Sequence, residues 1–384
     1  MVSFNECYKK SSKTLICTFL LIFFLVPVSL WAKQDTTINH IYKAGENGYA
    51  CFRIPAILTT KNNVLLAFAE ARRSDCGDAG DIDLVLKRSL NGGKTWEALQ
   101  VVWSDSTNTC GNPVPILDQT NGRIILISTW NLGIDHERQI MDGTSKDGRH
   151  VYVLTSDDEG KSWSKAREIT SSVKKDNWTW YATGPCHGLQ IQNGPHKGRL
   201  VVPVNHVESP LNLNYAHTIY SDDHGATWKL GNNTPQAMMN ETTIAEISGG
   251  RLMLNMRNAD RKIRTRHTSI SNDGGHTWSD VVNDSTLIEP ICQGTLLNTV
   301  SGKQQLFFAN PAHKVKRLNL TLRSSIDDGK TWATAKVIHT GPSAYSDITI
   351  YKKKNIAMLY ESGEVKPYEG IAFKILTLKE ASKP

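Results

Sequence analysis

The octapeptide Ser156-Asp-Asp-Glu-Gly-Lys-Ser-Trp163 is one of five copies of the pattern Ser-x-Asp-x-Gly-x-Thr-Trp. The Asp of the pattern can accept backbone N–H groups inside a turn, and the Gly supplies a positive φ at no steric cost. The Thr favours the start of a strand, and the Trp can fold back over the turn as a small apolar lid. Each copy therefore predicts a stiff hairpin turn. The other copies begin at Ser89, Ser221, Ser271 and Ser325, and the first has Asn91 in place of the Asp.

The spacing of these copies gives the size of a repeat. Successive Ser positions lie 67, 65, 50 and 54 residues apart, a mean of 59, and the 352 residues that follow position 32 are close to six such repeats. Repeats of this size built from short strands predict an all-β fold, a six-bladed β-propeller in one domain. Two packed β-sandwiches are the alternative, but they would not explain the regular hairpin. Six apolar segments with strand-like alternation support the count: 64–68, 124–127, 200–202, 251–256, 305–308 and 355–359.

The first 32 residues have the features of a targeting segment. Three lysines precede an apolar run from Leu15 to Leu30, which is short for a membrane span and has the order of a secretory signal. We expect cleavage after Ala32, which leaves the propeller over 33–384 as a secreted or periplasmic domain; a retained anchor is the alternative. The net charge of +7 falls to +5 without this segment, too diffuse a charge to argue for nucleic acid.

The cysteines do not form a recognisable framework. Two of the seven lie in the targeting segment, and an odd number remains at wide spacings, so we expect no disulfide. Cys-x-x-Cys, His-Glu-x-x-His and P-loop motifs do not occur, and structural zinc or nucleotide chemistry has no support. The five remaining cysteines are Cys51, Cys76, Cys110, Cys186 and Cys292.

Three arginines, Arg53, Arg257 and Arg317, stand at the start or end of predicted strands in different repeats. Strand ends of different blades converge near the axis of a propeller. Three guanidinium groups directed at one point would form a clamp for a carboxylate or phosphate. Taken singly, each arginine is better explained as a surface or ion-paired residue.

The five octapeptide copies resemble the Asp-box, a repeated turn motif of sialidases and several other propellers. With the motif Arg53-Ile-Pro55 they give the chain its resemblance: over residues 40–380 it resembles the bacterial and animal exo-α-sialidases (neuraminidases). The resemblance implies that Arg53, Arg257 and Arg317 hold the carboxylate of sialic acid. It also implies that Glu361 braces Arg53 and that Arg72 lines the site.

The same resemblance implies the catalytic residues. Tyr345, in Ala-Tyr-Ser-Asp, corresponds to the nucleophile, and Glu241 to its partner; Glu246 is the alternative for that partner. The acid falls on a Gly-rich loop six residues after Arg72, which favours Asp78 over Asp75. We interpret Asp81 and Asp83, which lead into the next strand, as structural.

The charge of the substrate explains why such a site would use a tyrosine. Sialic acid carries a carboxylate on its anomeric carbon, which would repel a carboxylate nucleophile, whereas a neutral phenol avoids the repulsion. Glu241 would then be the base for Tyr345, and Asp78 the general acid and base. Retention of configuration and no metal or organic cofactor are implied. The expected substrates are sialylated glycoproteins, gangliosides and oligosaccharides; neither nucleic acid nor a stable protein partner is implied.

Two other functions remain open. A trans-sialidase or intramolecular trans-sialidase would share these residues, and a non-catalytic glycan-binding propeller would share the Asp-boxes.

Two further segments are expected near the site. The aromatic segment 178–187 either forms a wall of a sugar pocket or packs on itself, and the polar segment 131–141 is expected to be a solvated loop over its mouth.

Overall fold

The computed structural model describes residues 38–299 and 304–383, so the predicted targeting segment lies outside the described residues. Strands dominate this part of the chain, as the sequence predicts, and its helices are short. The helical elements are α1 (Glu137–Met141), α2 (Thr170–Val173), α3 (Leu378–Ala381) and the 3₁₀ turn η1 (Ser248–Gly250).

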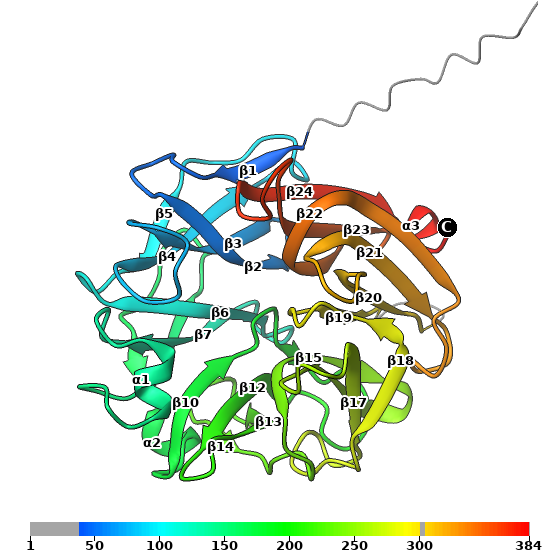
Figure 1. The fold of residues 1–384 in the computed structure, drawn as a ribbon. Coiled ribbons are helices and arrows are strands. Elements are labelled where there is room, and N and C mark those ends of the chain that lie inside the picture. The colour runs from blue at the N-terminus through cyan, green and yellow to red at the C-terminus, as the bar shows by residue number, and fades with distance from the viewer. Residues whose placement is uncertain (1–37, 300–303, 384) are drawn as a thin grey trace, which may run out of the picture. The chain divides into compact units, whose positions relative to one another are not determined.

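Antiparallel pairing groups the first half of the strands by sequence order (Figure 1). The first group contains β2 (Cys51–Thr59), β3 (Leu65–Arg72), β4 (Ile82–Ser89) and β5 (Gln100–Trp103). The second contains β6 (Thr109–Leu117), β7 (Ile124–Asn131), β8 (His150–Ser156) and β9 (Arg167–Glu168). The third contains β10 (Trp178–Thr183), β12 (Leu200–Glu208), β13 (Leu213–Ser221) and β14 (Lys229–Leu230), with β11 (Leu189–Gln190) also paired to β12.

The second half of the chain continues the pattern. The fourth group contains β15 (Met239–Ile247), β16 (Arg251–Asn258), β17 (Thr265–Ser271) and β18 (Val282–Ile288). The fifth contains β19 (Thr295–Asn298), β20 (Leu306–Pro311), β21 (Leu318–Ser325) and the start of β22 (Thr334–Tyr351). The sixth contains the rest of β22, β23 (Asn355–Ser362), β24 (Gly370–Thr377) and β1 (His40–Lys43).

Two of these boundaries fall inside continuous sheets. The first and second groups are joined only by a parallel bridge between Ile82 and Thr109. Strand β22 pairs with β21 up to Pro342 and with β23 from Ser343 onward. The predicted β-propeller is confirmed, and the count of six blades stays a prediction that rests on dividing the sheets at these two places.

The six apolar segments of the sequence all fall within or at the start of the second strand of a group, β3, β7, β12, β16, β20 and β23. The first strands line the centre, where β2 contacts both β6 and β22. In every group the first strand begins, and the second ends, at the same side of the molecule. The turn that joins the second strand to the third lies on that side too, and the Asp-boxes, which follow the third strand, lie on the opposite side.

The Asp-boxes form the expected turns. In the copy at Ser271, the Ser hydroxyl donates to Asp273 Oδ1 (2.8 Å) and accepts from Gly275 N (2.8 Å). Asp273 also accepts from both the N–H (2.9 Å) and the hydroxyl (2.6 Å) of Thr277. Gly275 has φ of 90°, the conformation for which the glycine was expected. One carboxylate therefore holds the turn together from inside.

The copy with Asn91 keeps the turn but changes one bond. Asn91 Oδ1 accepts from Thr95 N at 3.0 Å, as an Asp would. Its amide nitrogen then donates to the Thr95 hydroxyl at 2.8 Å, where an Asp oxygen would accept. This copy lacks the charge-assisted bonds of the others, in line with the weaker turn that its sequence predicts.

The Trp of the Asp-box does more than cover its own turn. Trp96 packs against Phe373 of the sixth group (ring centroids 5.1 Å apart), and Trp163 packs against Phe68 of the first (5.8 Å). Each Trp thus packs its hairpin against the preceding group. The sequence predicts only that the Trp covers its own turn.

The expectation of no disulfide is wrong. Cys51 and Cys76, 25 positions apart, form a disulfide with Cα atoms 5.3 Å apart. Cys51 pairs with Arg72 across β2 and β3, and the loop after β3 turns back toward Cys51. The proximity therefore arises from sheet pairing, which cysteine spacing does not reveal. The other three cysteines in the described part of the chain, Cys110, Cys186 and Cys292, are free and buried.

Candidate active site

A cavity of about 690 Å³ opens on the side where the first strands begin. All six strand groups and their loops contribute to its lining, because their ends converge there. Seven of the eight predicted site residues line it: Arg53, Arg72, Asp78, Glu241, Arg257, Arg317 and Tyr345. The eighth, Glu361, lies behind Arg53 and is fully buried.

Tyr345, on the second part of β22 that pairs with β23, lies at the centre of a polar cluster. Its hydroxyl donates a short hydrogen bond to Glu241 Oε1. Arg257 Nη1 donates to Glu241 Oε2 (2.5 Å) and to the Tyr345 hydroxyl oxygen (3.1 Å). The guanidinium groups of Arg53 and Arg317 lie 5.1 and 5.5 Å from the Tyr345 ring centroid. The three arginines predicted as a clamp therefore surround one tyrosine.

Burial raises the pKa of Tyr345 well above its usual value, and the negative charge of Glu241 raises it further. The charges of Arg257 and Arg317 act in the opposite direction. The phenol is therefore neutral in the free site. A phenolate formed beside Glu241 would be stabilised by two nearby cations and by the hydrogen bond from Arg257.

Glu361 organises the base of the site from β23. It accepts from Arg53 Nε at 3.1 Å, and it also accepts from the backbone N–H of Ile54 (2.9 Å) and of Tyr345 (3.1 Å). Ile54 has φ of 55°, rare for a β-branched residue, at an irregularity in the pairing of β2 with β3. One buried carboxylate thus fixes both the first arginine and the backbone that carries the tyrosine.

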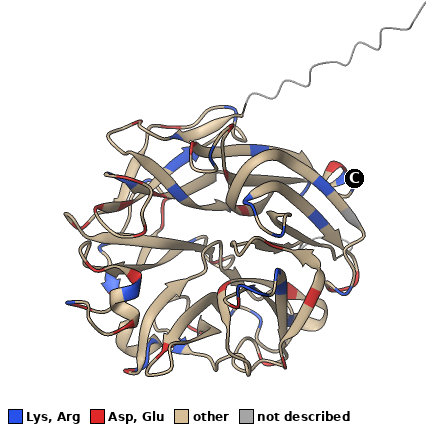
Figure 2. Ribbon diagram, viewed as in Figure 1, with Lys and Arg blue, Asp and Glu red and all other residues tan. Residues whose placement is uncertain are grey.

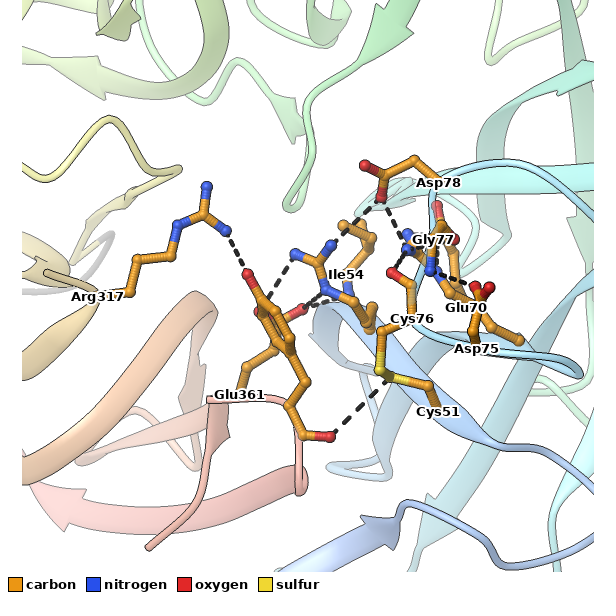
Figure 3. The surroundings of a disulfide bond; sticks show 12 residues. Cys51, Ile54, Glu70, Asp75, Cys76, Gly77, Asp78, Arg317 and Glu361 are labelled. Atoms are coloured by element: carbon orange, nitrogen blue, oxygen red, sulfur yellow. Dashed lines mark hydrogen bonds and ion pairs between the residues drawn. A yellow bond between two sulfur atoms is a disulfide. The ribbon is translucent and has the colours of Figure 1, made fainter. Parts of the chain in front are cut away.

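Asp78 lies on the loop between β3 and β4 (Figure 3). Its Oδ1 accepts from Arg72 Nη1 (2.8 Å) and Arg53 Nη1 (3.3 Å), while its side chain is 65% exposed. Partial desolvation inside the cavity would by itself raise the pKa of this carboxyl, but the charges of Arg72 and Arg53 lower it below its ordinary value. Arg72 is itself held by Glu70, whose Oε2 lies 2.5 Å from Nη2. Asp78 is therefore an anion in the free site.

The two alternatives that the sequence left open lie elsewhere. Asp75 Oδ1 accepts from Gly77 N at 2.6 Å, and Asp75 does not line the cavity. Glu246, at the far end of β15, accepts from the backbone of Gln192 (2.7 Å) and Asn193 (2.9 Å). The geometry thus favours Asp78 and Glu241 for the two roles. Asp83 is buried and accepts from Tyr49 (2.6 Å), in line with its structural interpretation.

Several lining residues were not identified from the sequence. Tyr368, on the loop between β23 and β24, accepts from Arg317 Nη1 (2.7 Å), and the Arg53 guanidinium lies 4.3 Å from its ring centroid.

Arg149 is buried, and burial lowers its pKa to about 10. It donates to Asn112 (2.6 Å) and covers the ring of Trp180 (3.9 Å), so the aromatic segment does form a wall. Arg149 precedes a strand just as Arg317 does, and that signal could have found it.

Segment 131–141 differs from the expected solvated loop. Its end forms α1, and Glu137, Arg138 and Met141 line the cavity. Asn205, on β12, also lines it, and both atoms of its buried amide lack a partner among the described residues. This amide can offer a donor and an acceptor to a ligand.

The charge of the lining favours an anion. Seven arginines but only four carboxylates line the cavity. Figure 2 shows Lys and Arg mixed with Asp and Glu around the ribbon, so the excess of arginines in the lining gives the cavity a positive charge of its own. No cluster of three or more His, Cys, Asp or Glu in residues 38–299 and 304–383 could hold a metal ion.

Comparison with known families and relatives identifies the family of this chain. Residues 63–358 match the family described as a BNR repeat-like domain. The chain is 31% identical to a sialidase of Micromonospora viridifaciens and 30% identical to one of Bacteroides fragilis, over 87% and 88% of its length. It spans only 52% and 64% of those two proteins. An exo-alpha-sialidase of Aspergillus fumigatus is 30% identical over 82% of this chain and 79% of the relative.

Solved structures show the same fold. The Hadza microbial sialidase Hz136 superimposes with a TM-score of 0.80 and 29% identity, over 88% of this chain and 68% of that one. An intramolecular trans-sialidase from Ruminococcus gnavus superimposes with a TM-score of 0.76 over 90% of this chain and 98% of that one. Because the two sequences are only 19% identical, this similarity shows a shared fold and nothing more.

Proposed function

The chain belongs to the sialidase family, and on that premise we propose that it is an exo-α-sialidase that hydrolyses terminal α-linked sialic acids with retention of configuration. The observation that carries the proposal is the contact between Tyr345 and Glu241 inside a ring of three arginines. A neutral nucleophile beside its base, among cations, suits a substrate with a carboxylate on the reacting carbon.

In the proposed first step the substrate carboxylate binds Arg53, Arg257 and Arg317. Tyr345 attacks the anomeric carbon as its hydroxyl proton passes to Glu241, which already accepts a hydrogen bond from that hydroxyl. Asp78 protonates the departing glycosidic oxygen, so the aglycone leaves as an alcohol. The arginines stabilise the flattened, oxocarbenium-like ring while the Tyr345 oxygen forms its bond to carbon.

In the second step Asp78, now a carboxylate, takes a proton from water, and the water attacks the anomeric carbon. The bond to Tyr345 breaks, and the phenol recovers its proton from Glu241. Two displacements at one carbon return the original configuration. Asn205 and the Trp180 wall would contact the other substituents of the sugar, which orients it for attack at Tyr345.

Asp78 must gain a proton before it can act, although it is an anion in the free site. Substrate binding supplies the reason for the change. A substrate carboxylate bound to Arg53 would partly neutralise the positive charge that stabilises the Asp78 anion in the free site. The bound sugar would also exclude water from the Asp78 carboxylate. Both effects raise the pKa of Asp78 in the complex.

Sialylated glycoproteins, gangliosides and oligosaccharides are the substrates that we propose. We also propose that the domain acts outside the cytoplasm, on the evidence of its N-terminal sequence. Among the described residues, no helix has the length and apolar character to cross a membrane.

The proposal is tested by NMR of the reaction with α2-3, α2-6 and α2-8 sialosides. We expect the α-anomer of free sialic acid to appear first and then to convert to the β-anomer. A β-anomer as first product would contradict retention. A 2,7-anhydro sugar, or transfer to an added acceptor in preference to water, would favour a trans-sialidase instead. Binding without turnover would favour a glycan-binding propeller.

A further inference from the structure

The Cys51–Cys76 disulfide lies close to the proposed chemistry. Cys51 begins β2, two positions before Arg53, and Cys76 lies on the loop after β3, two positions before Asp78 (Figure 3). The bond therefore joins the strand that carries the first arginine to the loop that carries the proposed acid. Cys51 is fully buried, whereas Cys76 is partly exposed and lines the cavity.

The base of this loop is closed by the hydrogen bond from Arg73 N–H to the carbonyl oxygen of Asp81 (3.1 Å), but its tip has little packing of its own. Arg73, Ser74 and Asp75 are exposed, and so are Gly77 and Asp78. Inside the loop, the carboxylate of Asp75 only closes a local turn with Gly77 N.

Two side chains of the sheet, Arg72 and Arg53, make polar contacts to this part of the loop, and Arg53 reaches only Asp78 Oδ1 (3.3 Å). Arg72 makes the others. Its Nη1 donates to the carbonyl oxygens of Cys76 (2.6 Å) and Gly77 (2.7 Å) and to Asp78 Oδ1. A hydrogen-bonded turn at an exposed site opens at low cost in free energy. A covalent link to a strand buried in the sheet cannot open in the same way.

We propose that the Cys51–Cys76 disulfide is a positioning element for the general acid, which holds Asp78 within reach of the leaving group. The inference rests on the proposed function. The disulfide acts through the loop. Its other polar neighbour is the carbonyl oxygen of Tyr368, 4.0 Å from Cys51 Sγ, and the disulfide has no direct hydrogen bond to the three arginines or to Tyr345 among the described residues. Its loss should therefore weaken proton donation and leave carboxylate binding and nucleophilic attack in place.

Leaving-group dependence separates these two effects. A natural sialoside such as sialyllactose needs protonation of its leaving oxygen, whereas a 4-nitrophenyl sialoside leaves with little help. For the variant Cys51→Ser/Cys76→Ser we expect kcat on sialyllactose to fall tenfold or more. On the aryl substrate we expect less than a threefold change, and KM should stay within about twofold for both substrates.

Reduction of the wild-type protein should give the same result reversibly. Dithiothreitol breaks the bond by two thiol–disulfide exchanges; it supplies two electrons and two protons, leaves two thiols on the protein and becomes a cyclic disulfide. Oxidation should restore the rate on sialyllactose. The double serine variant is the matched control, because dithiothreitol should not change its rate.

A double-mutant cycle with Asp78→Ala tests whether the disulfide acts through the acid. We expect Asp78→Ala alone to show the same split between the two substrates, and removal of the disulfide in that background to add nothing. Further loss of sialyllactose turnover in the Asp78→Ala background would overturn the inference, because the bond would then act by another route.

Other outcomes are equally decisive. Equal losses on both substrates, together with a lower midpoint of thermal unfolding, would assign the bond a purely structural role and overturn the inference. An unchanged ratio of the two rates would overturn it too. These results differ from failure of the proposed function, in which the wild-type protein hydrolyses neither substrate.

Discussion

Tyr345 is useful as a nucleophile only because of the charges placed around it. Glu241 accepts its hydroxyl proton, and Arg257 donates a hydrogen bond to the same oxygen. Glu361, buried behind the cluster, fixes both Arg53 and the backbone of Tyr345. The residues that position the tyrosine thus also position part of the carboxylate clamp, so loss of one contact should disturb both binding and attack.

The first prediction concerns the fork of Arg53. Arg53→Lys keeps the charge, but an ammonium carries its donors on a single nitrogen, whereas Arg53 reaches Glu361 through Nε and Nη2 and Asp78 through Nη1. We expect kcat/KM on sialyllactose to fall roughly 10–100-fold, or about 1.5–3 kcal/mol of transition-state binding. The matched control is Arg251→Lys on the opposite side, where Arg251 pairs with Asp328 at 2.9 Å. Equal activity in the two variants would remove Arg53 from the clamp.

The second prediction concerns the pH dependence due to Asp78, which must be protonated to act. In the free site the charges of Arg72 and Arg53 outweigh partial desolvation and lower the pKa of Asp78, and bound substrate should raise that pKa. Both kcat and kcat/KM should therefore decline as pH rises, with the decline in kcat at the higher pH. The profile of kcat/KM reports the free protein and that of kcat the complex. A decline in kcat at the lower pH would contradict the assignment.

Much of the site could be predicted from the sequence because its residues lie in short motifs at strand ends. Arg149 and Tyr368 were missed, although both line the cavity. Tyr368 reaches Arg317 only because the loop after β23 turns over the cavity, and no local pattern in the sequence records that path.

At the scale of elements, the Asp-box is a turn built around one carboxylate. The copy with Asp327 shows how strongly the turn stabilises the ionised carboxyl, because the Thr331 hydroxyl and N–H lower the pKa of Asp327 to about 2. A carboxyl whose pKa is lower in the folded than in the unfolded state stabilises the fold above the unfolded pKa, about 4. That contribution is lost as pH falls from about 4 to about 2.

The third prediction uses the natural exception. Asn91→Asp should convert the amide contact with Thr95 into a charge-assisted one, as in the other four copies. Because the site is exposed, we expect a gain of about 0.5–1 kcal/mol, or about 1–3 °C in the midpoint of thermal unfolding at pH 7. Calorimetry at pH 7 and at about pH 2.5 measures it. The gain should be largely lost at the lower pH, and a gain independent of pH would contradict the carboxylate explanation.

Strands and turns were predicted well because each is encoded locally, by alternation or by the octapeptide. The Cys51–Cys76 disulfide was not, since its cysteines meet only after β2 and β3 have paired. The interblade packing of Trp96 and Trp163 was missed for the same reason: its partners come from other repeats.

At the scale of the whole molecule, the chain closes on itself through β1. This N-terminal strand pairs with β24 and completes the last group. Tyr42 of β1 donates to the carbonyl of Ala67 in β3 (2.6 Å), and its ring lies 5.1 Å from that of Phe52 in β2. Tyr42 therefore connects the last group to the first.

The fourth prediction follows from this closure. Tyr42→Ala removes a buried aromatic ring and a hydrogen bond, which should cost about 3–5 kcal/mol and lower the midpoint of thermal unfolding by several degrees. Val365→Ala is the control, because Val365 is 79% exposed and should be neutral. If the two variants unfold at the same temperature, β1 does not close the structure.

The central claim, that Tyr345 is the nucleophile of a retaining sialidase, is tested most directly by a 3-fluorosialosyl fluoride. The fluoride leaves readily, while the ring fluorine slows hydrolysis of the covalent intermediate, so the intermediate should accumulate. Peptide mapping by mass spectrometry should then find the sugar on Tyr345 in the wild-type protein and no label at that position in Tyr345→Phe. A label on Asp78 or Glu241, or no label in a protein that hydrolyses sialosides, would contradict the account.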